Sequence, residues 1–321
     1  MSLTSFTVTY RVVTPMFLGG AEPTQEAELR LPSFKGALRF WWRALMWKEV
    51  KNLEDNLKDL RQREANLFGS SDAGQSKVLM QLNTALTSKN TMGARWERNS
   101  WEQYTGYGLR DKGERCFIPT GQEWIVKLNL RKCEPTQSAQ VLAALKLLGL
   151  VGGLGSRSRK GWGSVTLVKF DGADWQCPSD ALSWRRTVES LIPSNCPREA
   201  PFTAFTQNSR WANGPIQTSA ASAQEWLGRR YQELVKNTMP KPDRAQFGLP
   251  RKCADGSQPQ MERRASPLFL HIHDCDNRQA LPVALWLPAD FLADKPAIPG
   301  GGNSARRFLE SLNSASTSFA R

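Results

Sequence analysis

Three basic residues recur at four-residue spacing within one stretch of the chain. Lys35, Arg39 and Arg43 lie at i, i+4 and i+8 in the segment LPSFKGALRFWWRAL. Four residues turn a helix by about 400°, so the three side chains form one stripe along it. Few acidic residues share this stripe, and we therefore expect an external anion to balance its charge. Gly36 has no side chain, which would let a phosphate approach the start of the helix.

A second basic segment, GGLGSRSRKGWG, spans residues 152–163 and is named here the glycine-rich loop. Its candidate anion ligands are three glycines and three cations: Gly152, Gly153, Gly155, Arg157, Arg159 and Lys160. Glycines allow positive φ and close backbone approach, which suits anion binding by amide groups. A mononucleotide-binding turn runs from strand to helix, whereas this loop follows a predicted helix and precedes a predicted strand. We expect contact with a nucleic-acid backbone; a mobile hairpin without a ligand is the alternative.

Catalytic chemistry has little support in the sequence. His271, His273 and Cys275 alternate along a predicted strand, but a structural zinc site needs four ligands and no CxxC occurs. Packing in a sheet is the default for these residues. A metal-free ribonuclease could use His273 as a base beside Arg263 or Arg264. No paired-carboxylate, Ser/His/Asp or Cys/His arrangement is recognisable, so we expect neither catalysis nor a metal or cofactor.

The charge balance points to a polyanionic partner. The 321 residues include 43 Lys and Arg against 30 Asp and Glu, a formal net charge of +13. The surplus is concentrated at residues 30–51, 151–170 and 244–264, and the last segment adds Arg263 and Arg264 to the candidate ligands of a polyanion. No run of 18 apolar residues and no signal peptide is visible. The six cysteines are widely separated, which is typical of a reduced cytoplasmic protein.

Apolar periodicity predicts the elements that would position these residues. In the first half we expect a strand at 6–13, a helix capped by Ser33 and running to about residue 51, strands at 78–82 and 124–130, a helix at 138–148 and a strand at 164–170. This is the β-α-β-β-α-β order of a ferredoxin-like domain. In the second half we expect a helix at 220–236, strands at 267–273 and 281–286, and a helix at 304–312. Turn-rich sequence near residue 172 predicts two domains, 1–172 and 173–321.

Several stretches of the chain resemble the RAMP superfamily of CRISPR proteins, and within it the first subunits of type III-B (Cmr) effector complexes. The matching stretches are TPMFLGG at 14–20, LPSFKGALRFWWRAL at 31–45, EANLFGS at 64–70, GGLGSRSRKGWGSV at 152–165, FGLP at 247–250 and RRASPLFLHIH at 263–273. The WWR helix and the glycine-rich loop are specific only in combination.

The resemblance implies an α+β fold of two ferredoxin-like (RRM-like) domains, the second more degenerate. It also implies a non-catalytic RNA-binding subunit near the 3′ end of the guide RNA, contacting guide and target RNA and neighbouring RAMP subunits in antiviral defence. Two alternatives stay open. One is a RAMP endoribonuclease that processes guide precursors, and the other is an assembly protein whose basic surface meets acidic partner subunits.

Overall fold

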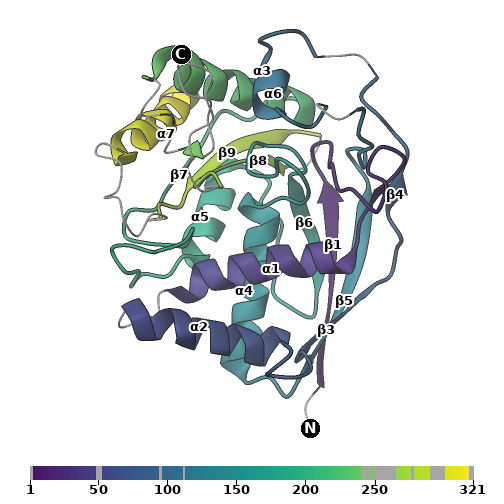
Figure 1. Cartoon of the computed structure of the whole chain (residues 1–321). Helices are drawn as coiled ribbons and strands as arrows, with labels where there is room; N and C mark the ends of the chain where they lie inside the picture. Colours follow the sequence, from purple (N-terminus) through teal and green to yellow (C-terminus); the bar gives the residue numbers. More distant parts are fainter. Residues whose placement is uncertain are drawn as a thin grey trace.

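Two antiparallel sheets with helices packed around them make up the fold (Figure 1). In the computed structural model, the described residues are 3–47, 53–93, 96–110, 113–240, 244, 247–248, 265–275, 278–289 and 301–317. None of the helices within these ranges is long and apolar enough to cross a membrane.

The first sheet has the strand order β3-β5-β1-β6. Its strands are β1 (Leu3–Val12), β3 (Val78–Leu82), β5 (Glu123–Arg131) and β6 (Val165–Asp171), and each neighbouring pair is antiparallel. Burial along β5 alternates residue by residue, as expected for a strand with one face on the core. Val8 of β1 pairs with Val126 of β5 on one side and with Phe170 of β6 on the other, so β1 lies between these two strands.

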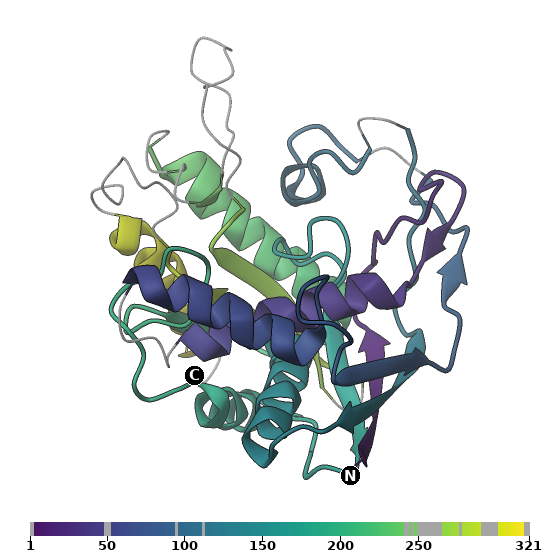
Figure 2. The ribbon, with the colours of Figure 1, turned by 60° about the horizontal axis from the view of Figure 1, so that its bottom comes forward.

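The helix predicted from Ser33 is present as α1 (Leu31–Met46), with a different start. α1 begins after an Arg30 cap, and Ser33 is a residue of its first turn. The prediction of a Ser33 cap was therefore wrong. Pro32 occupies a first-turn position, where its missing N–H costs nothing. Residues 48–52, into which the predicted helix extended, lie outside the described residues. α2 (Leu53–Phe68) lies beside α1 (Figure 2).

The helix α4 (Pro135–Val151) is buried along most of its C-terminal half. It precedes β6, and together with α1 it supplies the two helical crossovers of the first sheet. α5 (Ala181–Leu191) packs against it, where the Trp184 indole N–H donates to the Leu150 carbonyl at 3.0 Å. Because α5 follows residue 172, packing continues past that position, and the domain boundary stays a prediction.

The second sheet has the order β7-β9-β8 in the described residues. Its strands are β7 (Arg210–Asn213), β8 (Leu268–Asp274) and β9 (Ala280–Trp286). Every residue of β9 is buried, which places packed elements on both faces. One face is covered by α6 (Ala220–Tyr231), which continues as the π-helix η2 (Gln232–Thr238), and by α7 (Gly301–Thr317), and the other face packs against α4 in the core of the first half.

Three short elements complete the chain on the side of the glycine-rich loop. β2 (Ala27–Glu28) pairs with β4 (Thr87–Ser88), and Ser100 is the N-cap of α3 (Trp101–Thr105). Trp101 stacks on Trp162 of the loop, with ring centroids 6.1 Å apart and planes inclined by 17°. This aromatic contact fixes α3 against the loop.

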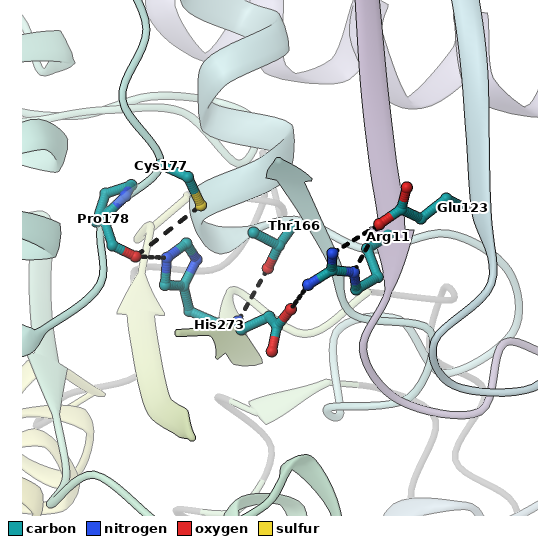
Figure 3. Close-up of polar contacts among 7 residues, drawn as sticks. Arg11, Glu123, Thr166, Cys177, Pro178 and His273 are labelled. Carbon is teal, nitrogen blue, oxygen red and sulfur yellow. Dashed lines mark hydrogen bonds and ion pairs between the residues drawn. The ribbon is translucent and has the colours of Figure 1, made fainter. Parts of the chain in front are cut away.

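The two sheets meet at the edges formed by β6 and β8. The Ile272 and Asp274 amides of β8 donate to the hydroxyls of Ser164 and Thr166, at 3.1 and 3.0 Å. Arg11 of β1 bridges Glu123 on β5 and Asp274 on β8 (Figure 3). Side-chain hydroxyls thus join two sheet edges that backbone pairing alone leaves separate.

Candidate nucleic-acid interface

The predicted basic stripe lies on α1 and faces α2. The Lys35 ammonium group donates to the Phe68 carbonyl at the end of α2, at 2.8 Å. Burial lowers the pKa of Lys35, and the positive charge of Arg39 lowers it further. Gly36 is exposed, and a Cβ there would meet nothing within 4 Å. The backbone beside the stripe is therefore open to a ligand.

A buried carboxylate balances part of the stripe. Glu64 of α2 accepts from Arg39 Nε at 2.6 Å and from Arg43 at 2.5 Å, and its side chain is only 7% exposed. Glu64 comes from a different helix, 21 and 25 positions from its partners, so it was not visible among the residues of the stripe. The expected external anion stays a prediction for the remaining charge. Arg39 and Arg43 still have 39% and 33% of their side chains exposed. Three cations against one carboxylate leave a net charge of +2.

The glycine-rich loop runs from α4 to β6, as predicted, and its glycines pack tightly. A Cβ on Gly152 would lie 2.7 Å from the Trp41 indole nitrogen. Gly155 has φ +83°, and a Cβ there would lie 2.5 Å from the Phe17 carbonyl oxygen. Gly153 forms an isolated antiparallel bridge with Ser164. These glycines let the loop fit closely against α1 and residues 14–20.

Two of the three cations in the loop turn toward the second sheet. The Arg159 guanidinium lies 5.0 and 4.5 Å from the ring centroids of Phe40 and Phe269, and it donates to the Ser266 carbonyl at 2.6 Å. Burial lowers the pKa of Arg159 to about 10. The Lys160 ammonium group donates to the Tyr231 hydroxyl at 2.6 Å. Both cations therefore hold the loop against the second half of the chain.

The third cation, Arg157, is exposed at the tip of the loop. Its guanidinium lies 5.9 Å from the ring centroid of Tyr107, and its backbone has φ +64°. The remaining predicted ligands, Arg263 and Arg264, lie outside the described residues. Arg159 and Lys160 therefore point inward and Arg157 points outward. The close spacing of the three residues in the sequence did not reveal this difference.

Both histidines of the chain are buried on β8. His271 Nδ1 lies 2.6 Å from the Gly152 carbonyl, and His273 Nε2 lies 2.9 Å from the Pro178 carbonyl (Figure 3). Burial lowers the pKa of His271 to about 3, with a smaller contribution from the neighbouring His273, and burial also lowers the pKa of His273. Cys275 is buried just beyond the strand. Across the described ranges, no three His, Cys, Asp or Glu side chains are placed to hold a metal ion.

This burial overturns the sketched role of His273 as a general base. A base must come within about 3 Å of the proton that it removes, and His273 is 0% exposed. The chain has only two histidines, so neither is available at the surface.

Sequence reasoning missed three residues of this region. Glu64 is hidden by its distance along the chain from the stripe. Arg115 donates to the Ser156 hydroxyl at 3.2 Å, which adds another cation beside the loop. Tyr107, 60% exposed, sits between two glycines in the sequence Gly-Tyr-Gly. That last pattern is a visible signal, because glycines on both sides of an aromatic residue leave its ring accessible.

The stretches that carried the family resemblance converge on the glycine-rich loop. Thr14 Oγ1 donates to the Gly161 carbonyl at 2.9 Å and accepts from the Ser164 amide. The Ser156 amide donates to the Phe17 carbonyl at 2.9 Å. The backbone of the loop also bonds to β8, where the Leu270 amide donates to the Arg159 carbonyl at 3.2 Å. Segments from residues 14–20, 152–165 and 265–273 are therefore joined by hydrogen bonds in the structure.

Comparisons with known proteins agree with the resemblance found in the sequence. The family model of the RAMP superfamily matches residues 9–166, which contain the first sheet, α1, α4 and the glycine-rich loop. Over these residues the chain is similar to RAMP superfamily proteins.

Within this superfamily it resembles the first subunit of the Cmr system. It is 27% identical over 268 residues to the CRISPR system Cmr subunit Cmr1-1 of Pyrococcus furiosus, with 76% of each chain covered. It is 25% identical over 172 residues to Cmr1-2 of the same organism, which covers 48% of this chain and 89% of that one.

Solved structures share the fold. The crystal structure of apo Cmr1 from Pyrococcus furiosus matches with a TM-score of 0.58 at 20% identity, covering 97% of both chains. A chain in the cryo-EM structure of the type III-B Cmr-beta complex bound to cognate target RNA matches with a TM-score of 0.63 at 11% identity, covering 97% of this chain and 99% of that one.

Proposed function

We propose that this chain is a non-catalytic RNA-binding subunit of a type III-B (Cmr) CRISPR effector complex, acting in antiviral defence. In this proposal it lies near the 3′ end of the guide RNA and contacts guide and target RNA. The observation that carries the proposal is the α1 stripe, where Arg39 and Arg43 are held by Glu64 yet remain one-third or more exposed. A guanidinium has five N–H donors, so each can contact a phosphate while bonded to Glu64.

The relatives supply the context for this proposal. The curated relatives are Cmr subunits, and one structural match lies in a complex with target RNA. We infer that the chain is cytoplasmic and contacts neighbouring RAMP subunits in such a complex. We also infer two ferredoxin-like domains. The order β3-β5-β1-β6 with crossover helices α1 and α4 supports the first, and β7, β9 and β8 form a less complete second unit.

We propose different roles for the predicted ligands. Lys35, Arg39 and Arg43 are the proposed phosphate contacts on α1, and Arg157 is the proposed contact on the loop. Arg159 and Lys160 are proposed to position the loop, because their charged groups point at Ser266 and Tyr231. The backbone at Gly36 is proposed to admit a phosphate. Arg263 and Arg264 stay predictions.

The test neutralises the stripe without leaving an unpaired charge buried in the protein. Removal of the arginines alone would leave the Glu64 carboxylate buried without a cation, so Glu64→Gln is added to Lys35→Gln, Arg39→Gln and Arg43→Gln. Binding of an unstructured, labelled single-stranded RNA is measured by fluorescence anisotropy over a range of salt concentrations. Loss of three phosphate contacts should reduce the slope of log K against log salt by about 2 and weaken binding about 100-fold near 0.1 M salt.

A matched control separates the stripe from net charge. It removes three exposed cations and one acid elsewhere: Lys169→Gln, Arg229→Gln, Arg306→Gln and Glu225→Gln. We expect this variant to bind RNA nearly as well as the native protein. Equal loss in both variants, or no change in the stripe variant, would refute the role of α1.

The histidine base that the endoribonuclease alternative could use is buried in this structure. Incubation of the protein with repeat RNA in EDTA tests it directly. We expect no specific cleavage, and reproducible cleavage at one position would favour the enzyme.

A further inference from the structure

The aromatic side chain of Tyr107 is unusually exposed. Among the described residues, the large hydrophobic side chains that stand exposed are Tyr107 at 60%, Leu182 at 57% and Ile216 at 37%. Leu182 begins α5 and Ile216 lies between β7 and α6, so neither shares a segment with Tyr107. A single exposed ring without apolar neighbours is too small a surface for protein docking. It is, however, large enough to stack one nucleobase.

A rigid aromatic base holds Tyr107 in place. The residue follows α3 directly, and α3 is fixed to the glycine-rich loop through Trp162. The Trp162 indole N–H donates to the Thr105 hydroxyl at 3.1 Å, and its ring lies against Trp101 and Trp96. Gly106 is still buried, and the chain becomes exposed at the next residue, Tyr107. The ring is thus presented on a fixed support rather than on an isolated loop.

A cation from a distant segment lies beside this ring. The Arg157 guanidinium is 5.9 Å from the Tyr107 ring centroid, although the two residues are 50 positions apart. Arg157 has φ +64°, a left-handed conformation that is strained for a non-glycine residue. A hydrogen bond from the Lys160 amide to the Arg157 carbonyl, at 2.8 Å, closes the turn that holds it there. The fold therefore maintains an exposed cation next to an exposed aromatic ring.

We propose that Tyr107 and Arg157 form a single-nucleotide site, in which one unpaired base of the bound RNA stacks on the Tyr107 ring and Arg157 contacts the adjoining phosphate. The proposal rests on the proposed RNA-binding function and names a contact outside the α1 stripe. Arg115, bonded to Ser156 next to Arg157, adds positive charge along the same path. Stacking does not depend on base identity, because every base has a π-face. The site would hold the strand in register without reading its sequence.

Two substitutions separate stacking from charge. Tyr107→Ala should weaken RNA binding about 5- to 150-fold, the range for loss of one stacked base, without changing the slope of log K against log salt. Tyr107→Phe keeps the ring and should bind like the native protein. Arg157→Gln should reduce that slope by about 0.7, the value for one phosphate contact on a single strand. Leu182→Ala, at a similarly exposed apolar residue on α5, is the control and should change neither quantity.

An abasic scan identifies the stacked nucleotide. The full-length protein is titrated with a set of single-stranded RNAs, each lacking the base at one position. At one position the missing base should cost the native protein as much as Tyr107→Ala does, and the two losses should not add. Additive losses at every position, or unchanged binding by Tyr107→Ala, would overturn the proposal.

The stripe variant distinguishes the two levels of failure. If that variant binds weakly while Tyr107→Ala binds normally, the nucleotide site is wrong and the RNA-binding function stands. If the native protein binds none of these RNAs, both are wrong.

Discussion

The Glu64 carboxylate makes the stability of α1 depend on the same arginines that are proposed to bind RNA. Replacing Arg39 and Arg43 with Gln would leave this carboxylate, 7% exposed, without either cation. Breaking a buried ion pair by removing one side costs about 3–5 kcal/mol. The two arginines are partly exposed, so solvent screening lowers the expected cost to about 2–3 kcal/mol. At about 2–4 °C per kcal/mol, the melting temperature should fall by roughly 4–12 °C.

Thermal unfolding followed by circular dichroism measures this cost. The informative comparison is Arg39→Gln with Arg43→Gln against the same pair combined with Glu64→Gln. We expect the triple variant to melt above the double variant, because the buried charge has been removed together with its partners. If the triple variant melts below the double variant, or the double variant melts like the native protein, Glu64 does not depend on these cations and the reasoning fails.

Three further predictions concern the junction between the two sheets. Burial keeps the folded-state pKa of His271 and His273 below the ordinary value, so the protein should have its full stability above about pH 6.5 and lose stability as the pH drops. The loss should reach up to about 1.4 kcal/mol per pH unit for each histidine until the folded-state pKa is reached. Urea unfolding between pH 7 and 5.5 measures this loss, and a flat profile would contradict it. Arg159→Ala should lower the free energy of unfolding by about 1–3 kcal/mol, through loss of the Phe40 and Phe269 contacts and of the bond to Ser266; an unchanged urea midpoint would show that the loop does not need this cation. Gly155→Ala should cost more than Gly74→Ala, since both have positive φ but only Gly155 has a backbone oxygen in the way; equal losses in melting temperature would contradict the packing argument.

Much of the fold could be predicted from local sequence patterns. The strand at 78–82 was predicted with its observed bounds, and the strands at 124–130 and 281–286 were predicted to within one residue. Their alternating or wholly apolar residues are sufficient to indicate half-buried or fully buried strands. β2, β4 and β7 were not predicted, because strands of two to four residues carry too little periodicity.

The site was harder to predict, because charge and spacing say nothing about which way a side chain turns. Arg157, Arg159 and Lys160 look equivalent in the sequence, yet Arg157 is exposed while the other two bond to Ser266 and Tyr231 in the second half of the chain. His271 and His273 alternate as surface ligands on one strand face would, but β8 is covered on both faces. Only the position of a strand within the packed layers distinguishes these cases.

By itself, the sequence determined that this chain carries a concentrated positive charge on one helix and one glycine-rich loop, and that its motifs are those of a RAMP protein. Charge and motif are properties of the covalent chain, so they are readable before folding. Tertiary structure alone decided which cations are available. It brought Glu64 to the stripe across 21 residues, turned Arg159 and Lys160 inward, and set Tyr107 beside Arg157. Each of these contacts joins segments far apart in sequence, and such pairs are selected by the packing of the whole core rather than by local pattern.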